Sequence, residues 1–248
     1  MNSLLRTGLV LLLLWPCSVC CFCANKGVVD TPAPAKIPQA KVLHIKTPVT
    51  IDGIIDAAWS HSPALILTAN YGPGAGSEVS LHSEARVMCD KINLYVLFVF
   101  EDPSVTFAYV NPDDILWDSG EKLDLAELIL QPGTNSQVYY EFAVNPAGAL
   151  LDSQVKWKRG QPTWNISWPD THPQVAAGRL SKDVNGIDGW CVEMAIPFDS
   201  IDFKPNKGTI MKANFHRADV DLPGKWLSWS PTLSRSIHVP SKFGCLFF

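Results

Sequence analysis

Apolar side chains recur at every second position along much of this chain, which is the spacing of a β-strand with one buried face. The segments 138–144 and 190–196 show this most clearly. The segment 92–100 is almost entirely apolar, which predicts a strand covered on both faces. Further strands are predicted at 42–45, 65–69, 85–89, 125–130, 149–155, 175–180, 210–217, 225–228 and 243–248.

Turn-forming pairs such as Asp52-Gly53, Asn145-Pro146 and Asp188-Gly189 separate these segments at short intervals. No stretch of helix length has an amphipathic pattern, and 56–60 and 197–201 predict single helical turns only. About a dozen short strands without long helices predict two stacked antiparallel sheets. The expected fold is therefore all-β, an antiparallel β-sandwich with a jelly-roll-like arrangement.

The first residues have the composition of a signal peptide. Arg6 precedes the apolar run 9–15, and a stretch of small residues follows at 17–24. A membrane-spanning helix needs about 20 apolar residues, and Pro16 interrupts this run earlier. Residues 1–23 are therefore predicted to be a removed signal, which places the mature protein in the periplasm or outside the cell. A lipid anchor on an N-terminal cysteine is the alternative.

Proline and alanine dominate the segment 24–40, which predicts an extended tether and a folded domain at 41–248. Four of the seven cysteines lie in the predicted signal. The other three, Cys89, Cys191 and Cys245, fall in strand-like apolar segments. We predict that these three thiols are reduced and buried.

The charge and the motifs limit the classes of function. The formal net charge is −4, or −5 without the signal and its Arg6. A mildly acidic chain without a Lys/Arg cluster is a poor ligand for nucleic acid or anionic lipid. The chain has no Gly-x-Ser-x-Gly elbow, no His-Glu-x-x-His helix and no phosphate-binding loop. His216 and His238 are more typical of hydrogen-bonded or surface residues than of catalytic bases. A monomeric binding protein is expected, rather than an enzyme.

Tryptophan is the more informative residue type, because flat rings suit the apolar faces of sugars. Trp59 and Trp190 lie in apolar patterns and are predicted to be core residues. Trp117, Trp164 and Trp168 lie among polar residues, so we predict that they are in loops where a ring can be exposed.

A series of short motifs follows a consistent order over about 200 residues of the chain. They are Ile51-Asp52-Gly53, Asp56, Trp59, Asp90, Leu94-Tyr95-Val96, Trp117, Asp124, Glu127, Leu128-Ile129-Leu130, Glu141-Phe142, Gly189-Trp190, Glu193, Ala195-Ile196-Pro197, Asn214, Arg217, Trp229-Ser230-Pro231 and Pro240-Ser241-Lys242-Phe243-Gly244. In these motifs and their order the chain resembles the family-nine carbohydrate-binding modules, β-sandwiches that bind cellulose or xylan and are often attached to xylanases. A consistent order of this kind is expected of a shared fold.

The resemblance implies non-catalytic binding of a poly- or oligosaccharide, in support of polysaccharide breakdown. The ligand-binding residues it implies are Trp117, Glu127, Glu141, Asn214, Arg217 and His238. It also implies that structural calcium is an option. The chain departs from the family at two positions. Ile237 and His238 stand where a second tryptophan is expected, and Ala143 replaces an arginine.

Two alternatives are left open. The first is an extracytoplasmic interaction or adhesion sandwich that has lost the sugar clamp. The second is a haem-binding relative, which would need Met88 or Met211 paired with a histidine, and no spacing in the sequence supports such a pair.

Overall fold

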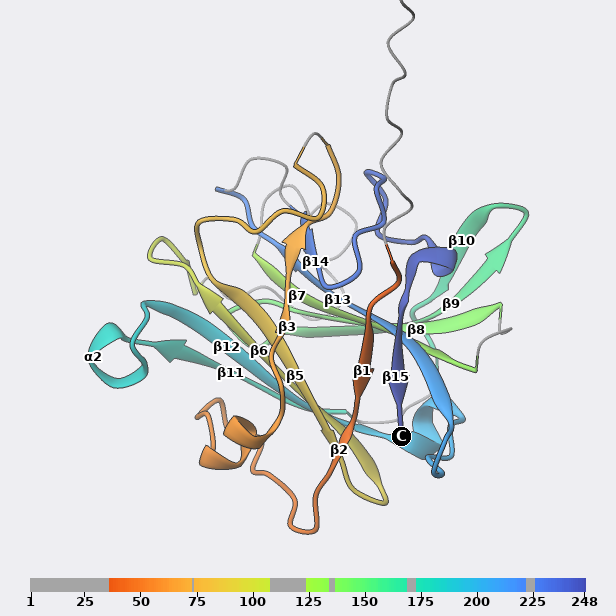
Figure 1. The fold of residues 1–248 in the computed structure, drawn as a ribbon, viewed down its shortest axis with the longest axis horizontal. Coiled ribbons are helices and arrows are strands. Elements are labelled where there is room, and N and C mark those ends of the chain that lie inside the picture. The colour runs from red at the N-terminus through yellow and green to blue at the C-terminus, as the bar shows by residue number, and fades with distance from the viewer. Residues whose placement is uncertain (1–35, 73, 108–123, 134–136, 169–172, 222–225) are drawn as a thin grey trace, which may run out of the picture. The chain divides into compact units, whose positions relative to one another are not determined.

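Two β-sheets lie face to face, and apolar side chains from alternate strand positions fill the space between them (Figure 1). Phe98 of one sheet contacts Phe215 of the other, with their ring centroids 6.0 Å apart. The computed structural model describes residues 36–72, 74–107, 124–133, 137–168, 173–221 and 226–248. The predicted signal and most of the predicted tether lie outside these ranges.

The larger sheet has nine strands and the smaller has six. The order in the larger sheet is β1 (Gln39–Lys41), β15 (Gly244–Phe247), β13 (Ile210–Ala218), β7 (Leu125–Pro132), β8 (Val138–Val144), β9 (Leu150–Lys158) and β10 (Gln161–Asn165), with β14 (Trp226–Ser228) on β13 and β4 (Thr68–Ala69) on β14. The order in the smaller sheet is β11 (Gln174–Leu180), β12 (Gly189–Pro197), β6 (Asn93–Glu101), β5 (Ser83–Cys89) and β2 (Leu43–His44), with β3 (Leu65–Ile66) on β5. The short helices are η1 (Ala57–His61), α2 (Lys182–Asn185), η2 (Phe198–Ile201) and η3 (Pro240–Lys242). None of the helices in the described ranges has the length and hydrophobicity needed to cross a bilayer.

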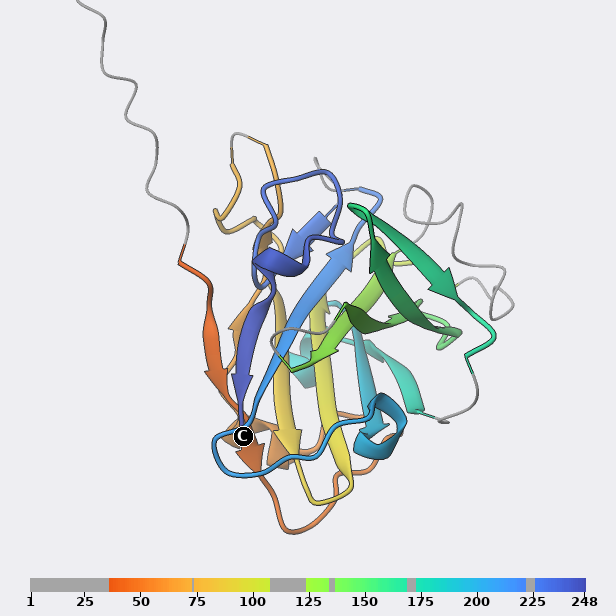
Figure 2. The same ribbon diagram turned by 90° about the vertical axis from the view of Figure 1, so that its right-hand side faces the viewer.

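The outer face of the larger sheet is covered by the segment that joins β14 to β15. Along β7, Ala126 and Leu128 point into the core between the sheets. Strand alternation therefore turns Glu127 and Ile129 outward. Ile237 and Phe243, from the covering segment, pack in one cluster with Ile129. Figure 2 shows the molecule turned by 90° from the view of Figure 1.

The expectation of purely antiparallel sheets was wrong at two places. β1 pairs with β15 in parallel, and β2 pairs with β5 in parallel. Neither pair is joined by a tight turn, so no local turn signal in the sequence fixes their direction. Because β1 begins at Gln39, the folded part also starts just before the predicted boundary at residue 41.

The opening Ile51-Asp52-Gly53 signature is attached to the smaller sheet by Glu193 of β12. The Glu193 carboxylate accepts hydrogen bonds from Trp59 Nε1 at 2.8 Å and from the backbone N–H groups of Gly53 at 3.0 Å and Asp52 at 3.3 Å. A Cβ at Gly178 would collide with the carbonyl oxygen of Gly53, so glycine permits this close backbone approach.

The predicted strands are present, but β1 and β10 were missed. Trp164 was predicted to lie in a loop and is part of β10. Trp168 was also predicted to be exposed, but its half-buried ring packs against Tyr140 with centroids 4.8 Å apart. The helical turns near 56–60 and 197–201 are confirmed by η1 and η2. The core assignments of Trp59 and Trp190 are also confirmed.

All three cysteines of the described domain are free thiols. Cys89 and Cys191 are buried, as predicted. Cys245 is half-buried, so the prediction of full burial was wrong for this residue. Its neighbour Leu246 points into the core, so strand alternation turns Cys245 to the outer face of the larger sheet.

Candidate functional site

A cavity of about 280 Å³ opens on the outer face of the larger sheet. It lies between the strands β7 to β10, the start of β14 and the covering segment. Half-buried tryptophans stand in its wall, and acidic groups and a histidine supply its polar part. The lining residues are Leu125, Glu127, Glu141, Ala143, Leu151, Trp164, Trp226, Arg235, Ser236, Ile237 and His238.

The register of β7 and β8 brings two acids together in this cavity. Glu127 lies directly opposite Ala143, and Glu141 lies opposite Ile129. The two glutamates are therefore diagonal neighbours on one face of the sheet, within reach of each other. The small side chain of Ala143, where the family resemblance implies an arginine, leaves room beside Glu127.

Glu127 is the acid of this pair whose protonated form is favoured. Burial, followed by the nearby charge of Glu141 and a hydrogen bond to it, raises the pKa of Glu127 well above its usual value. Two carboxyl groups can bond to each other only if one of them is protonated. Glu127 is 3% exposed, and its Oε1 atom is buried without a hydrogen-bond partner.

Glu141 is held from its other side by β9 and β10. Its Oε2 atom accepts hydrogen bonds from Trp164 Nε1 at 2.7 Å and from Ser153 Oγ at 3.4 Å. Its Oε1 atom faces His238 Nε2 at 3.8 Å, which is too long for a hydrogen bond. One carboxylate oxygen is thus tied to the sheet while the other faces His238.

His238 is positioned by aromatic neighbours. Its Nδ1 atom lies 3.0 Å from the Tyr139 hydroxyl, at hydrogen-bonding distance. The Trp164 ring meets the imidazole edge to face, with the centroids 5.1 Å apart. Burial lowers the pKa of His238, which Glu141 partly opposes, so the neutral imidazole is the main form at neutral pH.

His216 lies next to this group on the outer face of β13, directly opposite Glu127. Its Nδ1 atom is 2.6 Å from Ser228 Oγ, and its Nε2 atom is buried without a partner. Burial, with a smaller contribution from His238, lowers the pKa of His216 to about 3, which keeps the ring neutral. Its ring meets the Trp226 ring edge to face at 6.5 Å.

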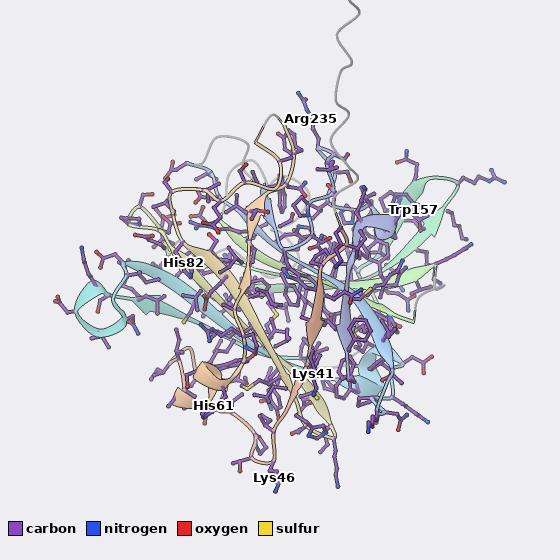
Figure 3. All side chains as sticks on the ribbon, in the orientation of Figure 1. Lys41, Lys46, His61, His82, Trp157 and Arg235 are labelled. Atoms are coloured by element: carbon purple, nitrogen blue, oxygen red, sulfur yellow. The ribbon has the colours of Figure 1, made fainter. Side chains whose placement is uncertain are left out.

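The rim of the cavity is formed by the exposed residues Arg235 and Ser236. Figure 3 shows Arg235 at the top of the molecule, with Trp157 on the hairpin of β9 and β10. Trp157 does not line the cavity.

The structure brings together three of the six predicted ligand-binding residues, Glu127, Glu141 and His238. Trp117 lies outside the described residues. Asn214 is fully buried and does not line the cavity. Its side-chain amide donates to Ser230 O at 2.8 Å and accepts from Ser230 N at 2.9 Å. Asn214 thus fixes the start of the covering segment, which is a positioning role.

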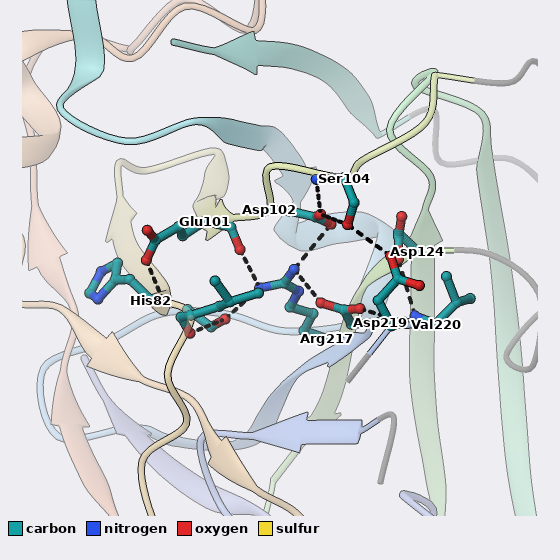
Figure 4. Close-up of polar contacts among 11 residues, drawn as sticks. His82, Glu101, Asp102, Ser104, Asp124, Arg217, Asp219 and Val220 are labelled. Atoms are coloured by element: carbon teal, nitrogen blue, oxygen red, sulfur yellow. Dashed lines mark hydrogen bonds and ion pairs between the residues drawn. The ribbon is translucent and has the colours of Figure 1, made fainter. Parts of the chain in front are cut away.

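The structure does not support a ligand-binding role for Arg217, which is fully buried on the core side of β13 (Figure 4). Its guanidinium forms ion pairs with Asp102, at 3.1 Å, and with Asp219. It also donates to Ser83 Oγ and to Glu101 O, each at 2.9 Å. An odd offset of three separates it from Asn214, so the two side chains must face opposite sides of the strand.

The acidic residues around Arg217 are a candidate for the calcium site that the resemblance implies. Asp102, Asp124 and Asp219 converge there with buried carboxylates. The guanidinium of Arg217 already lies against two of the three and supplies the positive charge that an ion would bring. Calcium takes six to eight oxygen ligands, so this cluster suits the arginine and does not fit a calcium ion.

Sequence reasoning missed Trp226 as a site residue and placed Trp164 in a loop, as a ring that could be exposed. The segment 161–165 is too polar to show the alternation of a half-buried strand. Trp226 was part of a predicted strand, but nothing in that short segment indicated which face of the sheet it occupies.

The fold is a β-sandwich with a cavity on the outer face of one sheet. The chain belongs to the carbohydrate family 9 binding domain-like family, whose model matches residues 51–247. The family resemblance found in the sequence is thereby confirmed.

The curated relatives are much longer proteins. The chain is 28% identical over 204 residues to endo-1,4-beta-xylanase A of Thermotoga neapolitana. It is 29% identical over 210 residues to endo-1,4-beta-xylanase A of Thermotoga maritima. Each match covers 81% of this chain but only 17% of the xylanase.

Solved structures show the same fold. A protein from Bacteroides uniformis is 18% identical and aligns with a TM-score of 0.62 over 86% of this chain and 100% of its own. A family 9 carbohydrate-binding module from Caldicellulosiruptor kristjanssonii has been solved with cellotriose and with glucose. The two structures are 20% and 19% identical to this chain, with TM-scores of 0.56 and 0.54, and cover 84% of it and 92% and 94% of their own chains.

Proposed function

We propose that this chain binds a carbohydrate without cleaving it, and that one sugar residue occupies the cavity on the larger sheet. The observation that carries the proposal is the combination of Trp164 and Glu141. The half-buried Trp164 ring stands in the cavity wall, and its N–H group fixes a carboxylate in the same cavity. A sugar needs an apolar surface for its C–H groups and polar groups for its hydroxyls.

The size of the cavity favours a single sugar unit or the end of a chain. Its volume of about 280 Å³ lies at the lower limit for small-molecule sites. A disaccharide has about 23 heavy atoms, and at about −0.3 kcal/mol per atom its affinity would be limited to a Kd near 10 μM. A ligand held mainly by one of its two units should bind more weakly, with a Kd on the order of 0.1–1 mM.

The acid pair supports binding rather than hydrolysis. Glycosidases hold their two carboxyl groups about 5–5.5 Å apart, or farther, on either side of the scissile bond. Glu127 and Glu141 are hydrogen-bonded to each other, so a glycosidic bond does not fit between them.

We further propose that the protein is exported and acts in the periplasm or outside the cell, beside enzymes that degrade polysaccharides. The signal-like sequence at 1–23 and the xylanases that contain related sequences support this role. A lipid anchor through a cysteine of that region is the alternative to release.

Calorimetric titration with glucose, xylose, cello-oligosaccharides and xylo-oligosaccharides tests the proposal. At least one of them should bind with a Kd of about 1 mM or below, and Trp164→Ala should weaken that binding about tenfold or more, through loss of one aromatic contact. Trp157→Ala is the matched control, because Trp157 is a half-buried tryptophan of the same hairpin outside the cavity.

Equal loss of binding in both variants would assign the effect to the hairpin rather than to the cavity. The absence of binding to every sugar at 10 mM would overturn the proposal and favour the interaction or adhesion alternative.

A further inference from the structure

The polar groups of the cavity have an arrangement that sugar binding does not require. Ligating atoms of Glu127, Glu141 and His238 all lie within 4.8 Å of one another. The three residues come from β7, β8 and the covering segment, so the fold itself brings them to one point. We infer that this group is a site for a divalent transition-metal ion of the Zn²⁺ type.

The outward-facing atoms of two of these residues are already engaged, which leaves the inward-facing atoms for an ion. The Tyr139 hydroxyl lies at His238 Nδ1, while Nε2 points toward Glu141. Trp164 and Ser153 donate to Glu141 Oε2, while Oε1 points toward His238. Metal-binding histidines and carboxylates are oriented by such partners on their far atoms.

The distance between the inward-facing atoms also suits a metal. His238 Nε2 and Glu141 Oε1 are 3.8 Å apart, which is too long for a hydrogen bond. Tetrahedral zinc with bonds of about 2.0–2.2 Å holds its ligand atoms about 3.3–3.5 Å apart. A contraction of a few tenths of an ångström would therefore let both atoms bind one ion.

Two buried atoms without partners provide a second and independent observation. Glu127 Oε1 has no hydrogen-bond partner, although Glu127 lines the cavity and is almost completely buried. His216 Nε2, on the residue opposite Glu127, is also buried and unpartnered. A buried polar atom without a partner lowers the stability of the fold. A metal ion bound at this group would give Glu127 Oε1 a partner.

The ligand types select the metal. One imidazole and two carboxylates match zinc and other first-row transition ions, whereas calcium and magnesium prefer oxygen ligands alone. Three protein ligands would leave one coordination position open toward the cavity.

Calorimetric titration of the metal-free protein with ZnCl₂, without sugar, tests this inference. We expect one Zn²⁺ per chain with a Kd on the order of 10 μM or below, and binding of Ca²⁺ and Mg²⁺ at least 100-fold weaker. Co²⁺ in place of Zn²⁺ should give a visible absorption band.

Four variants assign the site. His238→Ala and Glu141→Gln should each weaken Zn²⁺ binding at least 100-fold and remove the Co²⁺ band. Tyr139→Phe removes only the hydroxyl at His238 Nδ1 and should weaken Zn²⁺ binding about 10- to 100-fold. His82→Ala is the control, because His82 pairs with Glu84 outside the cavity and should leave the affinity unchanged.

Folding of each variant is checked by circular dichroism, and Tyr139→Phe keeps the inference testable if the larger changes unfold the domain. Wild-type Zn²⁺ binding weaker than 1 mM, or binding lost in His82→Ala and kept in His238→Ala, would overturn it. Either result would leave the proposed carbohydrate binding untouched, because no sugar is present in these titrations.

Discussion

Among single residues, Asp124 shows how burial separates acids that look alike in the sequence. Asp124 and Glu127 are three positions apart, and strand alternation places them on opposite faces. Glu127 enters the cavity, whereas Asp124 accepts a hydrogen bond from Val220 N at 3.3 Å in the Arg217 cluster. Two acids of one sequence motif thus have different surroundings, one in the cavity and the other in the Arg217 cluster.

The substitution Asp124→Asn should stabilise the protein at neutral pH. Burial, and then the charge of Asp102, raises the pKa of Asp124 to about 6, from near 4 in the unfolded chain. The folded state thus disfavours the charged form, and the wild type loses stability as the pH rises from about 4 through about 6. Asparagine keeps an acceptor for Val220 N and carries no charge. At pH 7.5 the variant should gain about 1–2 kcal/mol in free energy of unfolding, and at pH 4 nearly nothing.

Urea denaturation at pH 4, 5.5 and 7.5 measures this difference. Asp183→Asn, in the exposed helix α2, is the control and should show no such pH-dependent gain. A variant that is less stable than the wild type at pH 7.5 would show that the ionised Asp124 stabilises the fold through Arg217.

The limits of prediction at this scale have physical causes. Glu127, Glu141 and His238 were found because the family resemblance supplied them, and the structure brings them together. Asn214 and Arg217 could have been separated from the sequence, since an odd offset along one strand excludes a shared face. Trp164 could not be placed, because its strand lacks an apolar alternation and β9 defines its position.

At the scale of elements, the segment that contains Gly53 and Trp59 is held in place by one side chain of the smaller sheet. Glu193 of β12 receives the indole N–H of Trp59 and two backbone N–H groups. These contacts close a loop of more than 130 residues, so no local sequence pattern could predict them. The signature residues Gly53 and Trp59 therefore have a role in holding the fold together.

Glu193→Ala should destabilise the domain by about 3–5 kcal/mol, because the buried N–H groups of Trp59 and Gly53 and the part-buried N–H of Asp52 would lose their acceptor. Glu193→Gln keeps one acceptor oxygen and should destabilise the domain clearly less than Glu193→Ala. Chemical denaturation followed by tryptophan fluorescence measures both values. Equal stability of the alanine variant and the wild type would mean that water replaces the carboxylate, against the role assigned here.

The strength of the apolar pattern decides which strands could be predicted from the sequence. Strands in the core, such as β6, β8 and β12, have strong apolar patterns and were predicted almost to the residue. The short strands β1 and β2 join their sheets in parallel from a distant part of the chain. Their pairing follows from long-range packing, and hydrophobic periodicity contains no information about direction.

At the scale of the whole molecule, the sandwich protects its thiols to different degrees. Burial, followed by nearby acidic charge, raises the pKa of Cys89 to about 11 and that of Cys191 to about 12. The thiolate is the reactive form, so these two should react very slowly in the native state. Cys245, half-buried on β15, is the only one of the three with exposed surface to react.

Thiol titration of protein that lacks residues 1–23 should therefore label at most one cysteine under native conditions and three after denaturation. Cys245→Ser should remove the native labelling and leave two thiols in the denatured protein. Rapid native labelling of two cysteines in the wild type would contradict the burial of Cys89 or Cys191.

The pairing of the first and last strands has a mechanical consequence. β1 and β15 run in the same direction, joined by hydrogen bonds that include Cys245 N to Pro38 O at 3.0 Å and Val42 N to Phe247 O at 2.9 Å. Tension applied between Pro38 and Phe248 would act along both strands and load these bonds in shear. Bonds loaded in shear must break together rather than one after another. A force applied to the two ends of the sandwich would thus be borne first by the β1–β15 hydrogen bonds, and the strands around the cavity would be loaded only after these bonds break.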